Sequence, residues 1–200
     1  PCIVDGETNL DITVRRIVWG KWMNVGQTCV APDYVLIEEK YLADFTQKLI
    51  AEIKKQYSKE PQSNKDYGRV INQRHCARLI NYLEGLNIIH GGKHDVDERF
   101  IEPTVVVQPK LDDLIMQEEI FGPILPILTF KSKQSMIDFV RARPKPLACY
   151  AFTSNTEFES MVVEEISAGS ICINDTNIFL VNHELPFGGA GTSGMGNYHG

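Results

Sequence analysis

No stretch of this 200-residue sequence is apolar for long enough to cross a bilayer, since a membrane-spanning helix needs about 20 consecutive apolar residues. Positive charge is not in excess either: 20 Lys and Arg stand against 26 Asp and Glu, which gives a net charge of -6. Nucleic acids and anionic membrane surfaces are bound mainly through basic patches. We therefore expect neither nucleic acid nor a membrane as a main partner of this chain.

Cysteine is scarce, and no CxxC pair is present; the five cysteines stand at positions 2, 29, 76, 149 and 172. Their odd number and wide spacing do not fit a disulfide framework, so we expect reduced thiols and a cytoplasmic location. His90 and His94 are separated by two glycines and a lysine and lack a third ligand, so no metal site is expected. The glycine-rich end carries no lysine of a phosphate-binding loop.

The composition, 43% hydrophobic and 23% charged, is that of an ordinary globular protein, and no linker divides residues 1–200. Strand-like runs and helical periodicity alternate along the chain. Strands are predicted at 2–4, 34–37, 86–90, 104–107, 125–130, 147–153 and 170–174, and helices at 11–24, 41–57, 73–83, 134–141 and 156–166. The alternation predicts an α/β fold with a mainly parallel sheet and helices on both faces.

Cys29 stands on a short connector just after a predicted helix. Gly26 is suited to end that helix, and Pro32 prevents the chain from simply continuing it. Catalytic groups are often found on connectors held by rigid elements, and a thiolate attacks carbonyl carbon readily. Most free cysteines are instead buried small hydrophobic residues, and the spacing alone leaves this alternative open.

Three motifs resemble signatures of the aldehyde dehydrogenase family and occur in that family's order. They are Asn-Val-Gly-Gln-Thr-Cys at 24–29, Gln-Glu-Glu-Ile-Phe-Gly-Pro at 117–123, and Leu-Pro-Phe-Gly-Gly-Ala-Gly-Thr-Ser-Gly-Met-Gly at 185–196. The similarity runs nearly end to end. The sequences at 29–34 and 197–200 resemble the class 3 branch, whose substrates are fatty and aromatic aldehydes.

The resemblance implies a role for several residues. Cys29 would be the nucleophile, and its N–H could supply half of an oxyanion hole. Glu119 would accept hydrogen bonds from the nicotinamide ribose, with Phe121 packed beside the same ribose. The aldehyde pocket would be lined by Trp19, Met23, Thr28, Phe187 and His199. From the residues alone, Glu118 and Glu119 could equally be a solvated acidic pair, and Trp19 and Met23 a core stripe.

The implied reaction is oxidation of an aldehyde to a carboxylic acid through a thiohemiacetal and a thioester on the cysteine, with NAD or NADP as cofactor. The resemblance also implies parts outside residues 1–200. These are a general-base glutamate in a Glu-Leu-Gly-Gly-Lys motif just before Pro1, an oxyanion-hole asparagine, the dinucleotide-binding domain and a C-terminal oligomerisation strand. We therefore expect the chain to be the catalytic domain of a homodimeric parent, and to be inactive alone.

Two other classes of function remain open at this point. Cys29 could serve a thioester-forming acyltransferase or esterase, which would need a histidine or glutamate within hydrogen-bond reach of the thiol. The chain could also act only as a binding or folding unit. His75 is expected to be a surface helix residue rather than a base for Cys29.

Overall fold

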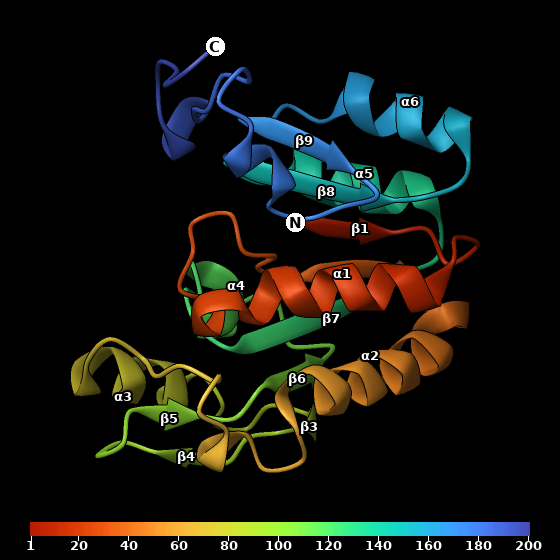
Figure 1. Cartoon of the computed structure of the whole chain (residues 1–200). Coiled ribbons are helices and arrows are strands. Elements are labelled where there is room, and N and C mark those ends of the chain that lie inside the picture. Colours follow the sequence, from red (N-terminus) through yellow and green to blue (C-terminus); the bar gives the residue numbers. More distant parts are fainter.

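A seven-stranded sheet forms the centre of the computed structural model, which describes residues 1–200 (Figure 1). Its strands are β1 (Cys2–Val4), β2 (Val35–Glu38), β3 (Ile88–His90), β6 (Thr104–Val107), β7 (Ile124–Phe130), β8 (Ala148–Phe152) and β9 (Ser170–Ile173). They lie in the order β3-β6-β7-β2-β1-β8-β9. Every neighbouring pair is parallel except β3 with β6, which is antiparallel. The predicted mainly parallel sheet is confirmed.

Helices cover both faces of this sheet, as predicted (Figure 1). One face carries α1 (Leu10–Trp22) and α2 (Leu42–Tyr57), and the other carries α3 (Gln73–Asn81), α4 (Leu114–Gln117), α5 (Lys133–Arg141) and α6 (Thr156–Glu165). Successive strand residues point to opposite faces, so Cys2 and Val4 join the core under α1 while Ile3 joins the core under α5. Both faces of the sheet are thereby buried, which explains the continuous apolar runs of its strands.

Polar residues in the sequence mark where most of these helices begin. The side chains of Asn9, Asn72 and Asn155 accept hydrogen bonds from the first turns of α1, α3 and α6. Ser132 does the same for α5. Each bond satisfies a backbone N–H that the helix itself leaves without a partner.

Two short strands were not foreseen from the sequence. β4 (His94–Asp95) and β5 (Phe100–Ile101) pair antiparallel in a separate two-stranded sheet. Two residues are too few to show an alternation of apolar and polar positions, so periodicity could not reveal either strand.

The helix before Cys29 ends earlier than its apolar spacing predicted. The α-helix stops at Trp22, and Met23–Gly26 form a 3₁₀ turn. Within that turn Asn24 and Val25 have left-handed φ values of 52° and 58°. The prediction of a helix to residue 24 is therefore wrong by two residues, because the chain turns away here to meet a distant loop described below.

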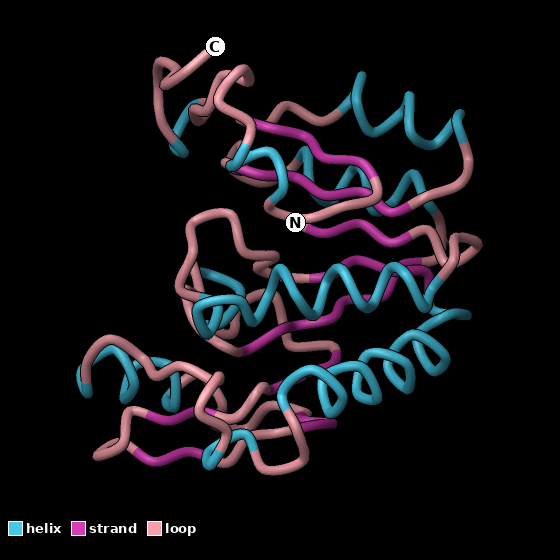
Figure 2. Tube along the Cα trace, in the orientation of Figure 1, coloured by secondary structure: helices cyan, strands magenta, loops and turns pink.

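Residues 174–200 form an irregular tail after β9 (Figure 2). It contains two short 3₁₀ turns, η4 (Ile178–Val181) and η5 (Gly191–Ser193). Phe187 and Tyr198 exchange two backbone hydrogen bonds of 2.7 Å, which fold the tail back on itself. None of the helices combines the length and the apolar character that a membrane span requires.

Asp5 anchors the carboxyl end of β1 through a buried polar network. Its carboxylate accepts hydrogen bonds from Lys133 Nζ at 2.9 Å, Thr153 Oγ1 at 2.7 Å and the N–H of Glu7 at 3.2 Å. Burial alone would raise the pKa of Asp5, but the bonds from Lys133, Thr153 and Glu7 outweigh it and hold the pKa below its usual 3.8. The ionised carboxylate therefore stabilises the fold at neutral pH, and this stabilisation is lost as the pH falls through the lowered pKa.

Lys133→Met should lower the free energy of unfolding by about 3 kcal/mol at about pH 7, because it leaves the Asp5 carboxylate buried without its cation. In the variant, burial would raise the pKa of Asp5 above its unfolded value. The loss of stability should therefore be smaller at about pH 4.5, where the carboxyl becomes protonated. Denaturant titrations at the two pH values measure both effects, with the exposed Lys131→Met as control. An equal loss at both pH values would contradict this interpretation.

Candidate active site

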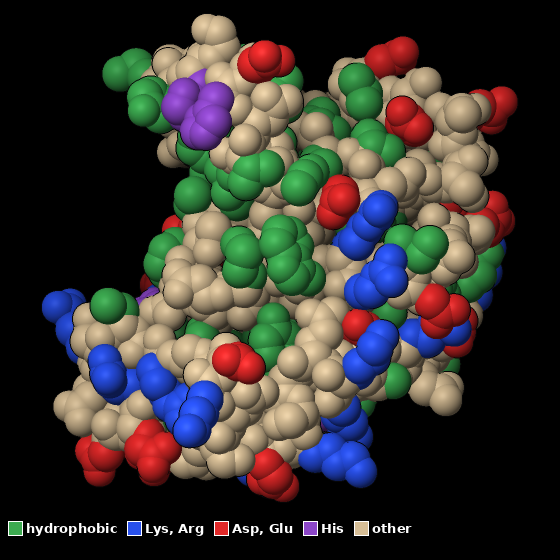
Figure 3. All heavy atoms as spheres, viewed as in Figure 1, with side chains coloured by type: hydrophobic (Ala, Val, Ile, Leu, Met, Phe, Trp, Pro, Cys, Tyr) green, Lys and Arg blue, Asp and Glu red, His purple; other side chains and the backbone are tan.

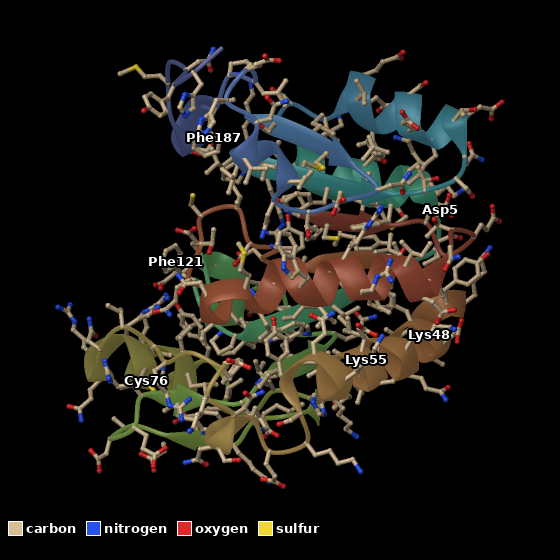
Figure 4. The ribbon with its side chains drawn as sticks, in the orientation of Figure 1. Asp5, Lys48, Lys55, Cys76, Phe121 and Phe187 are labelled. Carbon is tan, nitrogen blue, oxygen red and sulfur yellow. The ribbon has the colours of Figure 1, made fainter.

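A cavity of about 530 Å³ opens beside Cys29. Four segments line most of it, and each precedes a parallel strand: Pro1 before β1, 26–34 before β2, 116–121 before β7, and 143–148 leading into β8. The cavity therefore lies at the amino ends of the central strands. Figure 4 shows Phe121 at this edge of the molecule and Asp5, which follows β1, at the opposite one.

Cys29 sits at the tip of a tight turn and is exposed, whereas Cys2, Cys76 and Cys149 are buried. The N–H of Ala31 donates to the carbonyl of Thr28 at 2.9 Å and closes the turn around Cys29 and Val30. Cys29 is thus not a buried small hydrophobic residue. Its own N–H makes no hydrogen bond within the chain, so it is free to donate to an oxygen that arrives at the thiol.

The 119–123 loop is joined to the segment around Cys29 by close backbone contacts. A Cβ on Gly26, where φ is +72°, would lie 2.2 Å from the carbonyl oxygen of Gly122, so only glycine fits there. The N–H of Ile120 donates to Asp33 Oδ1 at 3.1 Å, and Trp22 Nε1 donates to the carbonyl of Pro123 at 2.9 Å. These contacts bring Glu119 and Phe121 into the cavity that holds Cys29.

Phe121 has a left-handed φ of 52°, which is costly for a bulky side chain. Two side chains of α3 hold the backbone there. His75 Nε2 lies 2.7 Å from the carbonyl oxygen of Phe121, and Arg78 donates to the carbonyls of Glu119 at 3.2 Å and Ile120 at 2.5 Å. Arg78 Nε also donates to His75 Nδ1 at 3.2 Å, so the ring proton sits on Nε2 and points at Phe121.

The supporting roles of His75 and Arg78 were not predicted from the sequence. His75 was expected to be a surface residue, but it is partly buried and supports the loop that carries Glu119 and Phe121. The two residues are separated from that loop by more than 40 positions in the sequence. Their spacing of three on one helix was the only local sign that they could act together.

Glu119 is an exposed carboxylate at the cavity. Desolvation by its neighbours and the negative charge of Asp33 raise its pKa, while Arg78 and Lys21 oppose this rise. Its carboxylate takes part in no hydrogen bond within the chain, so both oxygens remain available to hydroxyl donors.

Lys21 is an unexpected buried charge that is coupled to two residues of the cavity, Asp33 and Glu119. It belongs to α1 and is completely buried, and its Nζ has no hydrogen-bond partner. Burial lowers the pKa of Lys21 from 10.5 to about 8, against the opposing pull of Asp33 and Glu119. Its burial could not be expected from the sequence, because a lysine at the end of a helix ordinarily lies in solvent.

Arg143 and Lys145 also line the cavity and were missed. They lie on the segment between α5 and β8, where they alternate with Pro144 and Pro146. The Arg143 guanidinium lies 4.3 Å from the centre of the Phe139 ring, and its buried Nε has no hydrogen-bond partner. The alternation of basic residues with prolines was the signal for a rigid, charged loop.

Of the five predicted pocket residues, the structure places only Thr28 in the Cys29 cavity. Trp19 and Met23 lie on and just after α1, with Trp19 43% exposed. Phe187 and His199 lie on the tail, where Phe187 stacks on Phe179 at 6.4 Å. Apolar side chains gather where the tail passes above α1 (Figure 3), and Phe187 lies above Phe121 at the same edge of the molecule (Figure 4).

The model of the aldehyde dehydrogenase family matches residues 1–200, which is the whole chain. The chain belongs to the aldehyde dehydrogenase family. The membership that the three motifs indicated is therefore confirmed, and the fold agrees with it. A structure titled as the substrate-bound state of Staphylococcus aureus AldH superposes with a TM-score of 0.97 at 46% identity, covering 100% of this chain and 44% of that one.

Similar proteins of known family also belong to the aldehyde dehydrogenases. The dimeric NADP-preferring aldehyde dehydrogenase of Canis lupus familiaris is 43% identical over 200 residues, covering 100% of this chain and 44% of the relative. Aldehyde dehydrogenase family 3 member H1 of Arabidopsis thaliana is 45% identical over 205 residues, covering 100% of this chain and 42% of the relative. The aldehyde dehydrogenase chain described here thus spans less than half of the length of either.

Lys21→Met should remove a pH dependence of stability. The unfolded chain holds the Lys21 proton up to its ordinary pKa of 10.5, whereas the folded chain releases it near 8. Between these values the unfolded state binds more protons, so the free energy of unfolding rises with pH. From about pH 7 to about pH 9.5 the wild type should gain about 2 kcal/mol relative to the variant.

Denaturant titrations of the two proteins at both pH values measure this gain. The exposed Lys65→Met is the matched control and should titrate like the wild type. If the free energies of unfolding of Lys21→Met and of the wild type change equally between the two pH values, the folded protein does not bury the Lys21 ammonium.

Proposed function

We propose that this chain is the catalytic domain of a class 3-like aldehyde dehydrogenase that oxidises fatty or aromatic aldehydes to carboxylic acids. The observation that carries the proposal is the exposed thiol of Cys29 in one cavity with Glu119 and Phe121. Those are the residue types that the reaction needs at its nucleophile and at its cofactor. Membership of the family supports the assignment of these roles.

Cys29 carries the covalent chemistry in this proposal. Its thiolate adds to the aldehyde carbon, and the free N–H of Cys29 donates to the oxyanion that forms. The tetrahedral adduct then loses its hydride and becomes a thioester. Water attacks the thioester, which releases the carboxylic acid and returns the thiol.

The residues present fit the ribose of a nicotinamide cofactor, NAD or NADP, which would supply the hydride acceptor of this reaction. The Glu119 carboxylate can accept two hydrogen bonds from a vicinal diol, and charge-assisted bonds of this kind are strong. The Phe121 ring, on its constrained backbone, provides an apolar wall beside it. Trp19, Met23, Thr28, Phe187 and His199 are proposed to hold the aldehyde.

The complete protein is proposed to be a cytoplasmic homodimer. The Canis lupus familiaris relative is named as dimeric, which supports the proposed assembly. All five cysteines of this chain are free thiols, which fits a reducing compartment.

An acyltransferase or esterase built on Cys29 fits the cavity less well. Such enzymes activate the thiol with a neighbouring base, most often histidine. No histidine is among the residues that line this cavity. Asp33, Glu118 and Glu119 line it, and two of these make hydrogen bonds that hold the loops together.

Cys29→Ala in the complete protein should abolish oxidation of hexanal and benzaldehyde, because it removes the nucleophile. Dinucleotide affinity should stay within about 2-fold of the wild type, since the proposed cofactor contacts lie on the 119–121 loop. Absorbance of the reduced cofactor measures turnover, and fluorescence titration measures binding. Cys172→Ala removes a partly exposed thiol outside the cavity and serves as control. Substantial turnover by Cys29→Ala would exclude Cys29 as the nucleophile.

Glu119→Gln should slow hydride transfer by about 100-fold, since a small displacement of the nicotinamide is costly at the reacting centre. Thioester hydrolysis does not use this contact and should change less. A deuterated aldehyde should therefore show a larger kinetic isotope effect than in the wild type. The exposed Glu84→Gln is the control. An unchanged isotope effect in Glu119→Gln argues against a ribose-binding role.

A further inference from the structure

The hydroxyl of Tyr150 reaches from the centre of the sheet to the loop that carries the nucleophile. Tyr150 is 1% exposed and lies on β8, between Cys2 of β1 and Cys172 of β9. Its hydroxyl donates to the carbonyl of Val30, the residue after Cys29, and lies 3.0 Å from Asn177 Oδ1. One phenolic proton is therefore shared between the nucleophile loop and the tail.

Asn177 extends this contact to α1. It is 2% exposed, and its Nδ2 donates to the carbonyl of Gly20 at 3.0 Å. Its φ of 58° is left-handed, a conformation that asparagine tolerates better than most residues. Next to it, Thr176 Oγ1 donates to the carbonyl of Arg16 at 2.9 Å, which holds the same turn on α1.

The carbonyl of Val30 has no other hydrogen-bond partner within the chain. The Val30 side chain is 1% exposed, so the peptide lies in the core while Cys29 beside it faces the cavity. Burial raises the pKa of Tyr150, so the phenol keeps its proton at neutral pH and remains a donor. Loss of this one hydroxyl would leave a buried acceptor unsatisfied, which is costly.

The three joined segments carry the proposed reaction groups. The nucleophile is on the loop, Trp19 is on α1, and Phe187 is on the tail. An aromatic column runs alongside, since the Tyr150 ring lies 6.3 Å from that of Phe179, which in turn lies 6.4 Å from Phe187. One buried hydrogen-bonded hub, formed by Tyr150 and Asn177, thus connects the Cys29 turn with the two segments that carry Trp19 and Phe187 of the proposed aldehyde pocket.

We propose that Tyr150 and Asn177 are positioning residues that hold the Cys29 turn in a fixed position relative to the tail and α1. The effect on turnover rests on the proposed function, but the tether itself does not. Neither residue touches the reacting atoms; they act through the peptide of Val30 and through the segment that carries Phe187.

The test uses the complete protein and the variants Tyr150→Phe and Asn177→Gly. Phenylalanine keeps the ring and removes the hydroxyl, and glycine tolerates the left-handed φ while removing the amide. Hydrogen–deuterium exchange of peptides covering residues 28–34 should accelerate by roughly 10-fold in Tyr150→Phe, because the turn opens more often. Aldehyde kcat should fall by about 10- to 100-fold, with the dinucleotide dissociation constant within about 2-fold of the wild type.

Tyr67→Phe is the matched control. Tyr67 is 3% exposed and its hydroxyl donates to the carbonyl of Ile101 at 2.9 Å, so the variant deletes the same type of buried bond away from the Cys29 turn. It should leave exchange at 28–34 and aldehyde kcat near wild-type values. If Tyr67→Phe and Tyr150→Phe change both quantities equally, the effect is general destabilisation and the proposal is overturned.

A double variant separates a shared hub from two independent contacts. Tyr150→Phe with Asn177→Gly should slow turnover by much less than the product of the single effects, because the first substitution already opens the hub. Multiplicative effects would overturn the coupling. If the complete protein shows no aldehyde oxidation at all, the proposed function fails. Exchange at 28–34 then decides the tether by itself: unchanged exchange in Tyr150→Phe overturns it, and faster exchange supports it.

Discussion

The turn that carries Cys29 and the 119–123 loop meet through their backbones, and the arrangement of the candidate site depends on that contact. With Gly26 pressed against the Gly122 carbonyl, there is no room for a side chain between the two segments. Bonds from Ile120 to Asp33 and from Trp22 to Pro123 lie on either side of the contact. The early end of α1 follows from the same constraint, since the chain must leave the helix at Trp22 to bring Gly26 to the loop.

The site lies at an unusual edge for a parallel sheet. Ligands of open α/β sheets commonly bind beyond the carboxyl ends of the strands, where helix N-termini supply N–H donors. Here the cavity lies before β1, β2, β7 and β8, and charged side chains, among them Glu119, Arg143 and Lys145, line it. The charges of Asp33 and Glu119 oppose the lowering of the Lys21 pKa, and charge carried by fixed groups in a partly desolvated space acts more strongly than it would in water.

At two places in the site, an exposed residue stands next in sequence to a buried one. Val30 is buried while Cys29 is exposed, and Ile120 is buried while Glu119 is exposed. The side chains of Cys29 and Glu119 are thus each carried by a residue whose neighbour in sequence is fixed in the core. This arrangement gives a loop the positional precision that functional groups need, and which loops without such anchors lack.

The sequence by itself determined the elements and the candidate nucleophile. Periodicity and cap residues are local signals, so most helices and strands were located to within two residues, and Cys29 was correctly placed on a short connector. The motifs also identified Glu119 and Phe121, which share the cavity of Cys29.

Only the tertiary structure decided which edge of the sheet holds the site, that Lys21 is buried, and that His75 and Arg78 support Phe121. It also joined Tyr150 to Val30, 120 positions apart in the sequence. The physical reason is that these features arise from contacts between segments brought together by strand order. Strand order is set by the packing of the whole sheet and leaves no mark in the local spacing of residues.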